Sequence, residues 1–167
     1  LKLDKDKNIS GLSFEGEGCA ISLASASILT DVLKGKEYSY NETGYNIHKA
    51  IYQNRPDIEC IIHIHTPEIV AVSACKIGLM PISQWALHFY DGVSYHNYQS
   101  LALHSDQGES IAADLETSHF NILLHNHGSI SCGRTIEEAM FYTYHLQKAC
   151  ETQCKALAMQ QELIIPP

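Results

Sequence analysis

Long apolar runs, paired cysteines and basic stretches are all missing from this sequence. No apolar run approaches the ~20 residues that a membrane-spanning helix needs, so we expect no membrane association. The formal charge of −8 and the lack of a basic stripe exclude nucleic acid as an expected partner. No apolar signal-peptide core follows the first residues. The sequence begins with Leu1 and not with Met, so we expect a fragment or a trimmed product.

The six cysteines have neither a C-x-x-C pair nor the spacing of small secreted proteins. We therefore expect reduced thiols and a cytoplasmic protein. Cys150 and Cys154 share a helix face, where core packing is the expected role.

What is present is a globular composition: 167 residues, of which 45% are hydrophobic. Composition changes near Lys36, which predicts a short first part (residues 1–36) and a larger second part (37–167). In the first part, Leu1–Asp4 and Ile9–Phe14 predict two short strands of a hairpin, and Cys19–Leu33 predicts a helix rich in Ala and Ser.

The second part alternates between helical and strand patterns, which predicts a layered α/β fold. A capping box at Thr135 and Glu138 indicates the start of the last helix. The predicted helices are 43–54, 67–76, 105–115 and 135–161, and the predicted strands are 58–64, 80–83, 93–95, 121–125 and 129–132.

Histidines follow two of the predicted strands. His63 and His65 are two residues apart at a strand end, so both imidazoles can reach one ion from the same face. His127, after a second apolar strand and before a glycine, is the best third ligand, although His125 would share its face in a continuous strand. Three histidines with an open position are typical of catalytic zinc. The alternative is that the histidines of the H-x-H are core residues.

The remaining histidines are scattered, and we expect them to be ordinary, partly exposed residues. They are His48, His88, His96, His104, His119 and His145.

Several motifs together resemble the class II aldolase/adducin family. They are Ile51-Tyr52-Gln53-Asn54-Arg55-Pro56-Asp57, Ile61-Ile62-His63-Ile64-His65-Thr66-Pro67, Ala71-Val72-Ser73-Ala74, Leu79-Met80-Pro81-Ile82-Ser83-Gln84, Asn126-His127-Gly128 and Gly133-Arg134-Thr135-Ile136-Glu137-Glu138-Ala139. The resemblance runs from about Tyr38 to the C-terminus. It implies a three-layer α/β/α domain, truncated at its N-terminal side, and one zinc ion bound by His63, His65 and His127.

The aldolases of that family cleave a carbon–carbon bond of a sugar phosphate, with zinc as the Lewis acid. A carboxylate early in the helix before the H-x-H strand acts there as acid/base and can be the fourth zinc ligand. Counted back from His63, that position is Gly44, and Glu42 lies two residues away. This departure is similar to the adducin-type branch, which keeps the fold without established aldolase chemistry.

Residues 1–36 resemble a different family, the NifU/IscU-type iron–sulfur scaffolds. The matching segments are Phe14-Glu15-Gly16-Glu17-Gly18-Cys19-Ala20-Ile21-Ser22 and Ala24-Ser25-Ala26-Ser27-Ile28-Leu29-Thr30-Asp31. That resemblance implies a ligand role for Cys19, but the C-G-D motif and the later cysteine of the scaffold family are missing.

Three functions follow from these patterns. The first is a zinc-dependent aldehyde-lyase acting on small sugar phosphates, the second a non-catalytic adducin-like assembly module, and the third a fragment of an iron–sulfur cluster scaffold. The aldolase resemblance also implies a homo-oligomer, with a tetramer as the family's usual form. A domain that lacks part of its sheet would leave an apolar face to cover, which favours the same expectation.

Overall fold

The structure, a computed structural model, describes residues 2–3, 9–11, 42–99 and 105–166. The chain divides into two compact units, Leu1–Asn41 and Glu42–Pro167. In the first unit, β1 (Lys2–Leu3) pairs antiparallel with β2 (Ile9–Gly11), which confirms the predicted hairpin. The predicted helix Cys19–Leu33 and the predicted boundary between residues 36 and 37 lie outside the described residues.

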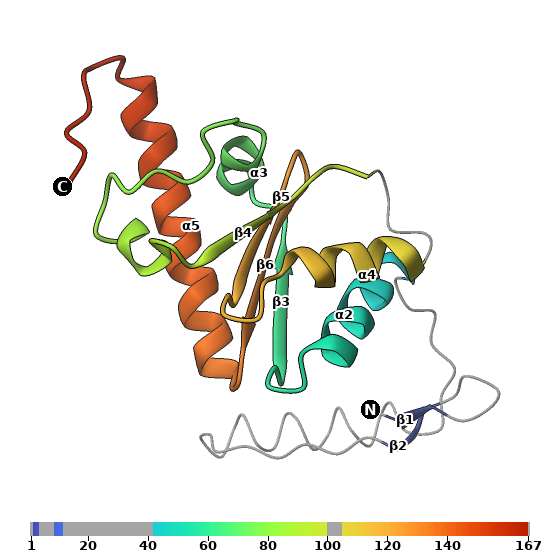
Figure 1. The fold of residues 1–167 in the computed structure, drawn as a ribbon. Helices are drawn as coiled ribbons and strands as arrows, with labels where there is room; N and C mark the ends of the chain where they lie inside the picture. The colour runs from blue at the N-terminus through green and yellow to red at the C-terminus, as the bar shows by residue number, and fades with distance from the viewer. Residues whose placement is uncertain (1, 4–8, 12–41, 100–104, 167) are drawn as a thin grey trace. The chain divides into compact units, whose positions relative to one another are not determined.

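The second unit is built on a four-stranded mixed sheet of order β3-β6-β5-β4 (Figure 1). β6 lies between β3 and β5 and is antiparallel to both, whereas β4 is parallel to β5. The strands are β3 (Cys60–Ile64), β4 (Val93–His96), β5 (Asn121–Leu124) and β6 (Gly128–Gly133).

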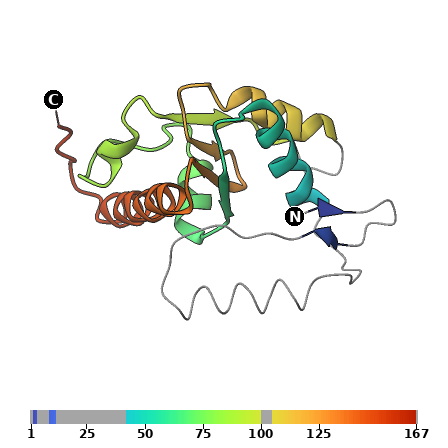
Figure 2. The same cartoon turned by 90° about the horizontal axis from the view of Figure 1, so that it is seen from below.

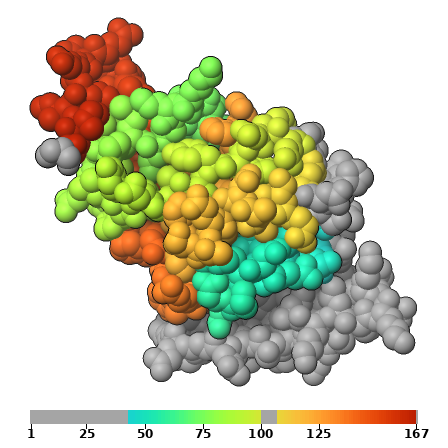
Figure 3. Space-filling model, viewed as in Figure 1, coloured from blue at the N-terminus to red at the C-terminus, as the bar shows by residue number. Residues whose placement is uncertain are grey.

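Four of the described helices cover the two faces of this sheet, which gives the three-layer α/β/α domain that the family resemblance implied. One face carries α2 (Glu42–Asn54) and α4 (Ser105–Asp114), and the other carries α3 (Pro67–Ser73) and α5 (Ile136–Ala158) (Figure 2). α2 and α4 lie side by side, and their side chains form one continuous surface in the space-filling view (Figure 3). No helix in the described part of the chain combines the length and the apolar character needed to cross a membrane.

The buried strand β5 joins the two halves of the core. Its side chains alternate in direction: Ile122 and Leu124 pack with α2 and α4, while Leu123 packs with α3 and α5. All three are no more than 1% exposed. A strand covered on both faces by helices has apolar residues at successive positions, as Ile122, Leu123 and Leu124 do.

The long helix α5 begins as its capping box predicted. The Thr135 hydroxyl accepts a hydrogen bond from Glu138 N at 3.2 Å, and Glu138 Oε2 accepts one from Arg134 N at 2.6 Å. Gly133 leaves room for this turn, because a Cβ there would lie 2.4 Å from Ala139 N.

The predicted strand 80–83 is wrong. Pro81 has no N–H for a sheet ladder, and the neighbouring backbone is bonded to a side chain of α5 instead. The fully buried Gln153 accepts a hydrogen bond from Met80 N and donates one to Gly78 O, each at 2.8 Å. A short 3₁₀ helix, η1 (Ala86–Phe89), follows this segment and had no clear sequence signal.

Candidate metal centre

Two segments, β3 and the turn between β5 and β6, carry the histidines of the candidate metal centre. His63 lies within β3, opposite Ile130 of β6, and His65 directly follows the end of β3. The turn begins where β5 ends, and Asn126 adopts a left-handed conformation with φ 59°. His127 N donates to Leu124 O at 3.0 Å, which closes the turn. Asparagine tolerates this conformation better than most residues, so the Asn126-His127-Gly128 sequence suits the turn.

Gly128 allows the turn to approach β3. A Cβ at this position would lie 2.4 Å from Ile64 O and 2.9 Å from His65 Cδ2, both far shorter than an ordinary contact. Only glycine fits without displacing one of the two segments. The glycine after His127 therefore brings His127 and His65 together.

The three histidines form one cluster. Their ligand atoms all lie within 4.8 Å of one another, and the ring centroids are 4.4 Å (His63–His65), 5.0 Å (His63–His127) and 4.8 Å (His65–His127) apart. His63 and His127 are half-buried, and His65 is exposed. Tetrahedral zinc with bonds of ~2.1 Å needs nitrogens roughly 3.4 Å apart, which small side-chain rotations would give. The arrangement could hold one divalent ion and leave its fourth position to solvent or substrate.

His63 is held in the form that a metal requires. Its Nδ1 lies 2.8 Å from Ser129 O, and since a carbonyl only accepts, Nδ1 carries the hydrogen and Nε2 is left free. Burial lowers the pKa of His63 to about 4; the bond to Ser129 opposes this, and His65 and His127 add to it. Burial also lowers the pKa of His127, and electrostatic repulsion from His65 and His96 lowers it further. Metal ligation needs neutral imidazoles, which both shifts favour.

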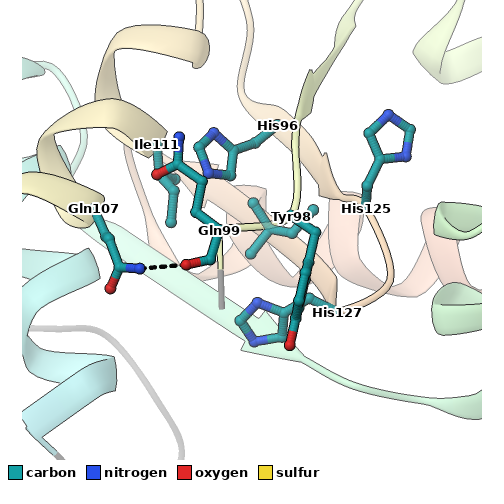
Figure 4. A pocket seen from close by; sticks show the side chains of 8 residues that line it. His96, Tyr98, Gln99, Gln107, Ile111, His125 and His127 are labelled. Carbon is teal, nitrogen blue, oxygen red and sulfur yellow. Dashed lines mark hydrogen bonds between the residues drawn. The ribbon is translucent and has the colours of Figure 1, made fainter. Parts of the chain in front are cut away.

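A small cavity of about 10 Å³ adjoins His127 (Figure 4). Its lining comes from the end of β4 and the residues after it, from α4 and from the turn after β5. The lining residues are His96, Tyr98, Gln99, Gln107, Ile111, Leu124, His125 and His127. A second cavity of about 260 Å³ lies between η1 and residues 79–81, and none of the three clustered histidines lines it.

The structure brings together the three predicted ligands and separates them from His125. The His125 ring stacks on Tyr95, and its Nδ1 lies 2.6 Å from Ser73 O, because the turn breaks the alternation of a continuous strand. Gly44 lies in α2 as expected. Within residues 43–99 and 107–166, no Asp or Glu joins the three-histidine cluster.

The expectation that His96 is an ordinary, partly exposed residue is wrong. His96 is only 4% exposed, and its Nδ1 lies 2.6 Å from Asp114 Oδ2 at the end of α4. The one sequence signal that could have found it is its place at the end of a predicted strand, as with His63.

Comparison with known proteins agrees with this fold. Residues 14–154 match the family model of the Class II Aldolase and Adducin N-terminal domain. A Pseudomonas aeruginosa protein named as an aldolase class 2 protein is 39% identical over 157 residues, which cover 94% of this chain and 60% of that protein. Mouse alpha-adducin is 39% identical over 144 residues, covering 85% of this chain and 20% of the adducin.

Solved structures give the same result. An aldolase II superfamily protein from Pseudomonas syringae is 37% identical with a TM-score of 0.76, over 81% of this chain and 55% of that one. An L-fuculose 1-phosphate aldolase from Glaciozyma antarctica is 29% identical with a TM-score of 0.68, over 80% of this chain and 51% of that one. The chain thus spans less than two thirds of each of these relatives.

The comparisons give no support to the resemblance of residues 1–36 to iron–sulfur scaffolds. The family match instead includes residues 14–36, and with them Cys19. The fold and the matched range lead to one assignment: this chain belongs to the class II aldolase and adducin N-terminal domain family.

Proposed function

We propose that His63, His65 and His127 bind one zinc ion and that the chain is a zinc-dependent carbon–carbon lyase acting on small sugar phosphates. The observation that carries this proposal is the cluster of three imidazoles, all within 4.8 Å, with no fourth protein ligand from residues 43–99 or 107–166. A closed structural zinc site takes four protein ligands, whereas three ligands leave a position for substrate.

The residues around the cluster fit this role. Bound zinc would act as a Lewis acid on the substrate's carbonyl and hydroxyl oxygens. The Ser129 carbonyl orients His63 and fixes its tautomer, which raises the basicity of the ligand nitrogen. The exposed position of His65 keeps one side of the cluster open to an incoming ligand. The printed name of the Glaciozyma relative, an L-fuculose 1-phosphate aldolase, supports a sugar phosphate as the substrate class.

A homo-oligomer, with a tetramer as its form, is part of the proposal. It is supported by a group of large apolar side chains left exposed on the first half of α5, with Trp85 next to them; Trp85 and Tyr144 have ring centroids 6.3 Å apart. The large apolar side chains exposed on the first half of α5 are Ile136, Met140, Phe141 and Tyr144. Large exposed apolar patches of this kind are typical of interaction surfaces.

Gly44 favours a second candidate, a non-catalytic adducin-like assembly module. Glycine cannot supply the carboxylate that the aldolase resemblance places at this position, and losing a positioned base typically costs roughly 10²–10⁴-fold in rate. The 39% identity to alpha-adducin supports this candidate as well. In that case the metal would serve structure alone.

Zinc binding and turnover together test the proposal. The chain is stripped with a chelator, reloaded with zinc and analysed for metal content, beside His63→Ala, His65→Ala and His127→Ala. His88→Ala is the matched control, because His88 is an exposed histidine outside the cluster. We expect one zinc per chain in the parent and the control and none in the three variants. Zinc retained by all three variants would overturn the site.

The reaction is tested with a panel of ketose and aldose phosphates, by measuring the aldehyde released. Turnover that disappears in His63→Ala supports the lyase. Full zinc occupancy without turnover on any member of the panel supports the assembly module.

A further inference from the structure

We propose that His96, oriented by Asp114, is the catalytic acid/base of the metal centre and takes the place of the carboxylate missing at Gly44. This inference rests on the proposed lyase function and assigns the proton-transferring residue of that same site.

The topology places His96 on the same cavity as His127, one of the three proposed metal ligands. β4 and β5 run parallel, with His96 opposite Leu124, so the carboxyl ends of both strands meet at one edge of the sheet. His127 follows Leu124 by three residues, and His125 N donates to His96 O at 2.9 Å, which ties the turn to the end of β4. His96 and His127 line the same cavity (Figure 4). Carboxyl ends of strands are where α/β folds place their reactive groups.

The pairing with Asp114 orients the imidazole of His96 and fixes its tautomer. A carboxylate accepts hydrogen bonds, so at 2.6 Å from Asp114 Oδ2 the Nδ1 of His96 carries the hydrogen. The other nitrogen, Nε2, then has a free lone pair. A base oriented by a third group is the arrangement that activates histidine in many hydrolases. The His96 side chain is 5% exposed and that of Asp114 is 45% exposed, so the carboxylate stays hydrated while the imidazole lies inside.

The described cavity lining offers few competitors for this role. Besides His96 it holds His127, assigned to the metal, His125, which is bonded to Ser73 O, and the phenol of Tyr98. Two glutamines and two aliphatic residues complete the described lining, and none of these eight residues carries a carboxylate or a basic Lys or Arg. His96 is therefore the one imidazole of the described lining that is neither assigned to the metal nor bonded to Ser73 O.

The proton transfer balances without a further reactant. In the cleavage direction, the proton of the substrate hydroxyl moves to His96 Nε2 as that C–O bond becomes a carbonyl and the adjacent C–C bond breaks. The electron pair of the C–C bond stays on the ketone-forming fragment. His96 then returns the proton to that carbon, which regenerates the neutral imidazole.

His96→Asn and Asp114→Asn test the assignment. Asparagine at position 96 can still donate to Asp114 but cannot take up a proton, which separates chemistry from the structural link between β4 and α4. His119→Asn is the control, because His119 also bonds to β4, through Ser94 Oγ at 2.9 Å, but does not line the cavity. All three variants are expected to bind one zinc per chain.

We expect kcat for sugar-phosphate cleavage to fall by roughly 10²–10⁴ in His96→Asn with KM within a few-fold of the parent, and the control to keep its rate. Asp114→Asn should also lower kcat, as expected for loss of the carboxylate that orients the imidazole. An unchanged rate in His96→Asn, in an active and zinc-loaded parent, overturns the role of His96 and leaves the lyase standing. An inactive parent overturns both.

A readout independent of turnover is the tautomer of His96 in the metal-free chain. Long-range ¹⁵N–¹H spectra should show His96 with its hydrogen on Nδ1, and the signal should shift in Asp114→Asn. A His96 that carries its hydrogen on Nε2 in the parent overturns the proposal.

Discussion

Gly128→Ala should damage both stability and metal binding, because of where its Cβ would lie. The added carbon would be 2.4 Å from Ile64 O and 2.9 Å from His65 Cδ2, whereas ordinary contacts begin near 3.4 Å. The turn and β3 must therefore separate by about 1 Å, and overpacking of this kind typically costs about 1–3 kcal/mol. For a domain of this size, each kcal/mol lowers Tm by about 2–4 °C.

The same displacement acts on the ligands. Metal–ligand distances tolerate about 0.2 Å, so moving His65 away from His127 by several times that amount should weaken zinc binding by at least about 10-fold. Urea unfolding of the metal-free chain measures the first effect, and competition with a chromophoric zinc chelator measures the second.

Gly92→Ala is the matched control. It adds the same atom where the nearest neighbours would be 3.9 Å and 4.0 Å away, so its stability should stay within about 0.5 kcal/mol of the parent. If Gly128→Ala matched this control in both urea midpoint and zinc affinity, the close approach of the turn to β3 would have no part in building the site.

Three further outcomes can be measured on the same material. In the metal-free chain, the pKa of His63 is about 4 in the folded state and 6.5 in the unfolded state, so the unfolded state binds more protons between these two values. The free energy of unfolding should therefore fall by at most about 3 kcal/mol as the pH drops through this window. Urea midpoints at pH 7.5, 5.5 and 4.5 should depend less on pH in His63→Asn than in the parent, and parallel curves would contradict this. Zinc at a hundred times its Kd should raise the free energy of unfolding by about 2.7 kcal/mol. A chelator should reverse this gain, and His65→Ala should not show it. An equal gain in His65→Ala would place the ion elsewhere. Gln153→Leu should lower the free energy of unfolding by about 2–4 kcal/mol, because it leaves Met80 N and Gly78 O unpaired. The control Gln161→Leu, on the exposed tail, should leave it nearly unchanged. Equal urea midpoints for the two variants would refute the role of the buried amide.

Local patterns in the sequence predicted much of the fold. The β-branched run before His63 predicted β3, and the apolar segment before Asn126-His127-Gly128 predicted β5 and its turn, because these signals depend only on neighbouring residues. The order of the strands was not predictable in this way. β6 lies between β3 and β5 through pairings that the chain makes only after folding.

The residues of the candidate site, too, were predictable only where their signal is local in the sequence. His63 and His65 stand out because their spacing places them on one face of a strand. The pairing of His96 with Asp114 leaves no such trace, since the two residues are 18 positions apart and meet only when α4 packs on β4. Gln153 is a similar case, because its partners Gly78 and Met80 lie in a different part of the chain. Long-range polar partners of this kind are decided by tertiary packing, which spacing and composition do not encode.

The two segments that carry the triad, residues 63–65 and residue 127, are about 60 positions apart in the chain. An ion held by both acts as a cross-link, and by the chain-entropy model closing a loop of about 60 residues in the unfolded state costs about 4 kcal/mol. The unfolded chain should therefore hold zinc far more weakly than the folded one. Separation of β3 from the turn before β6 should therefore require release of the ion, so bound zinc should slow the opening of this part of the sheet.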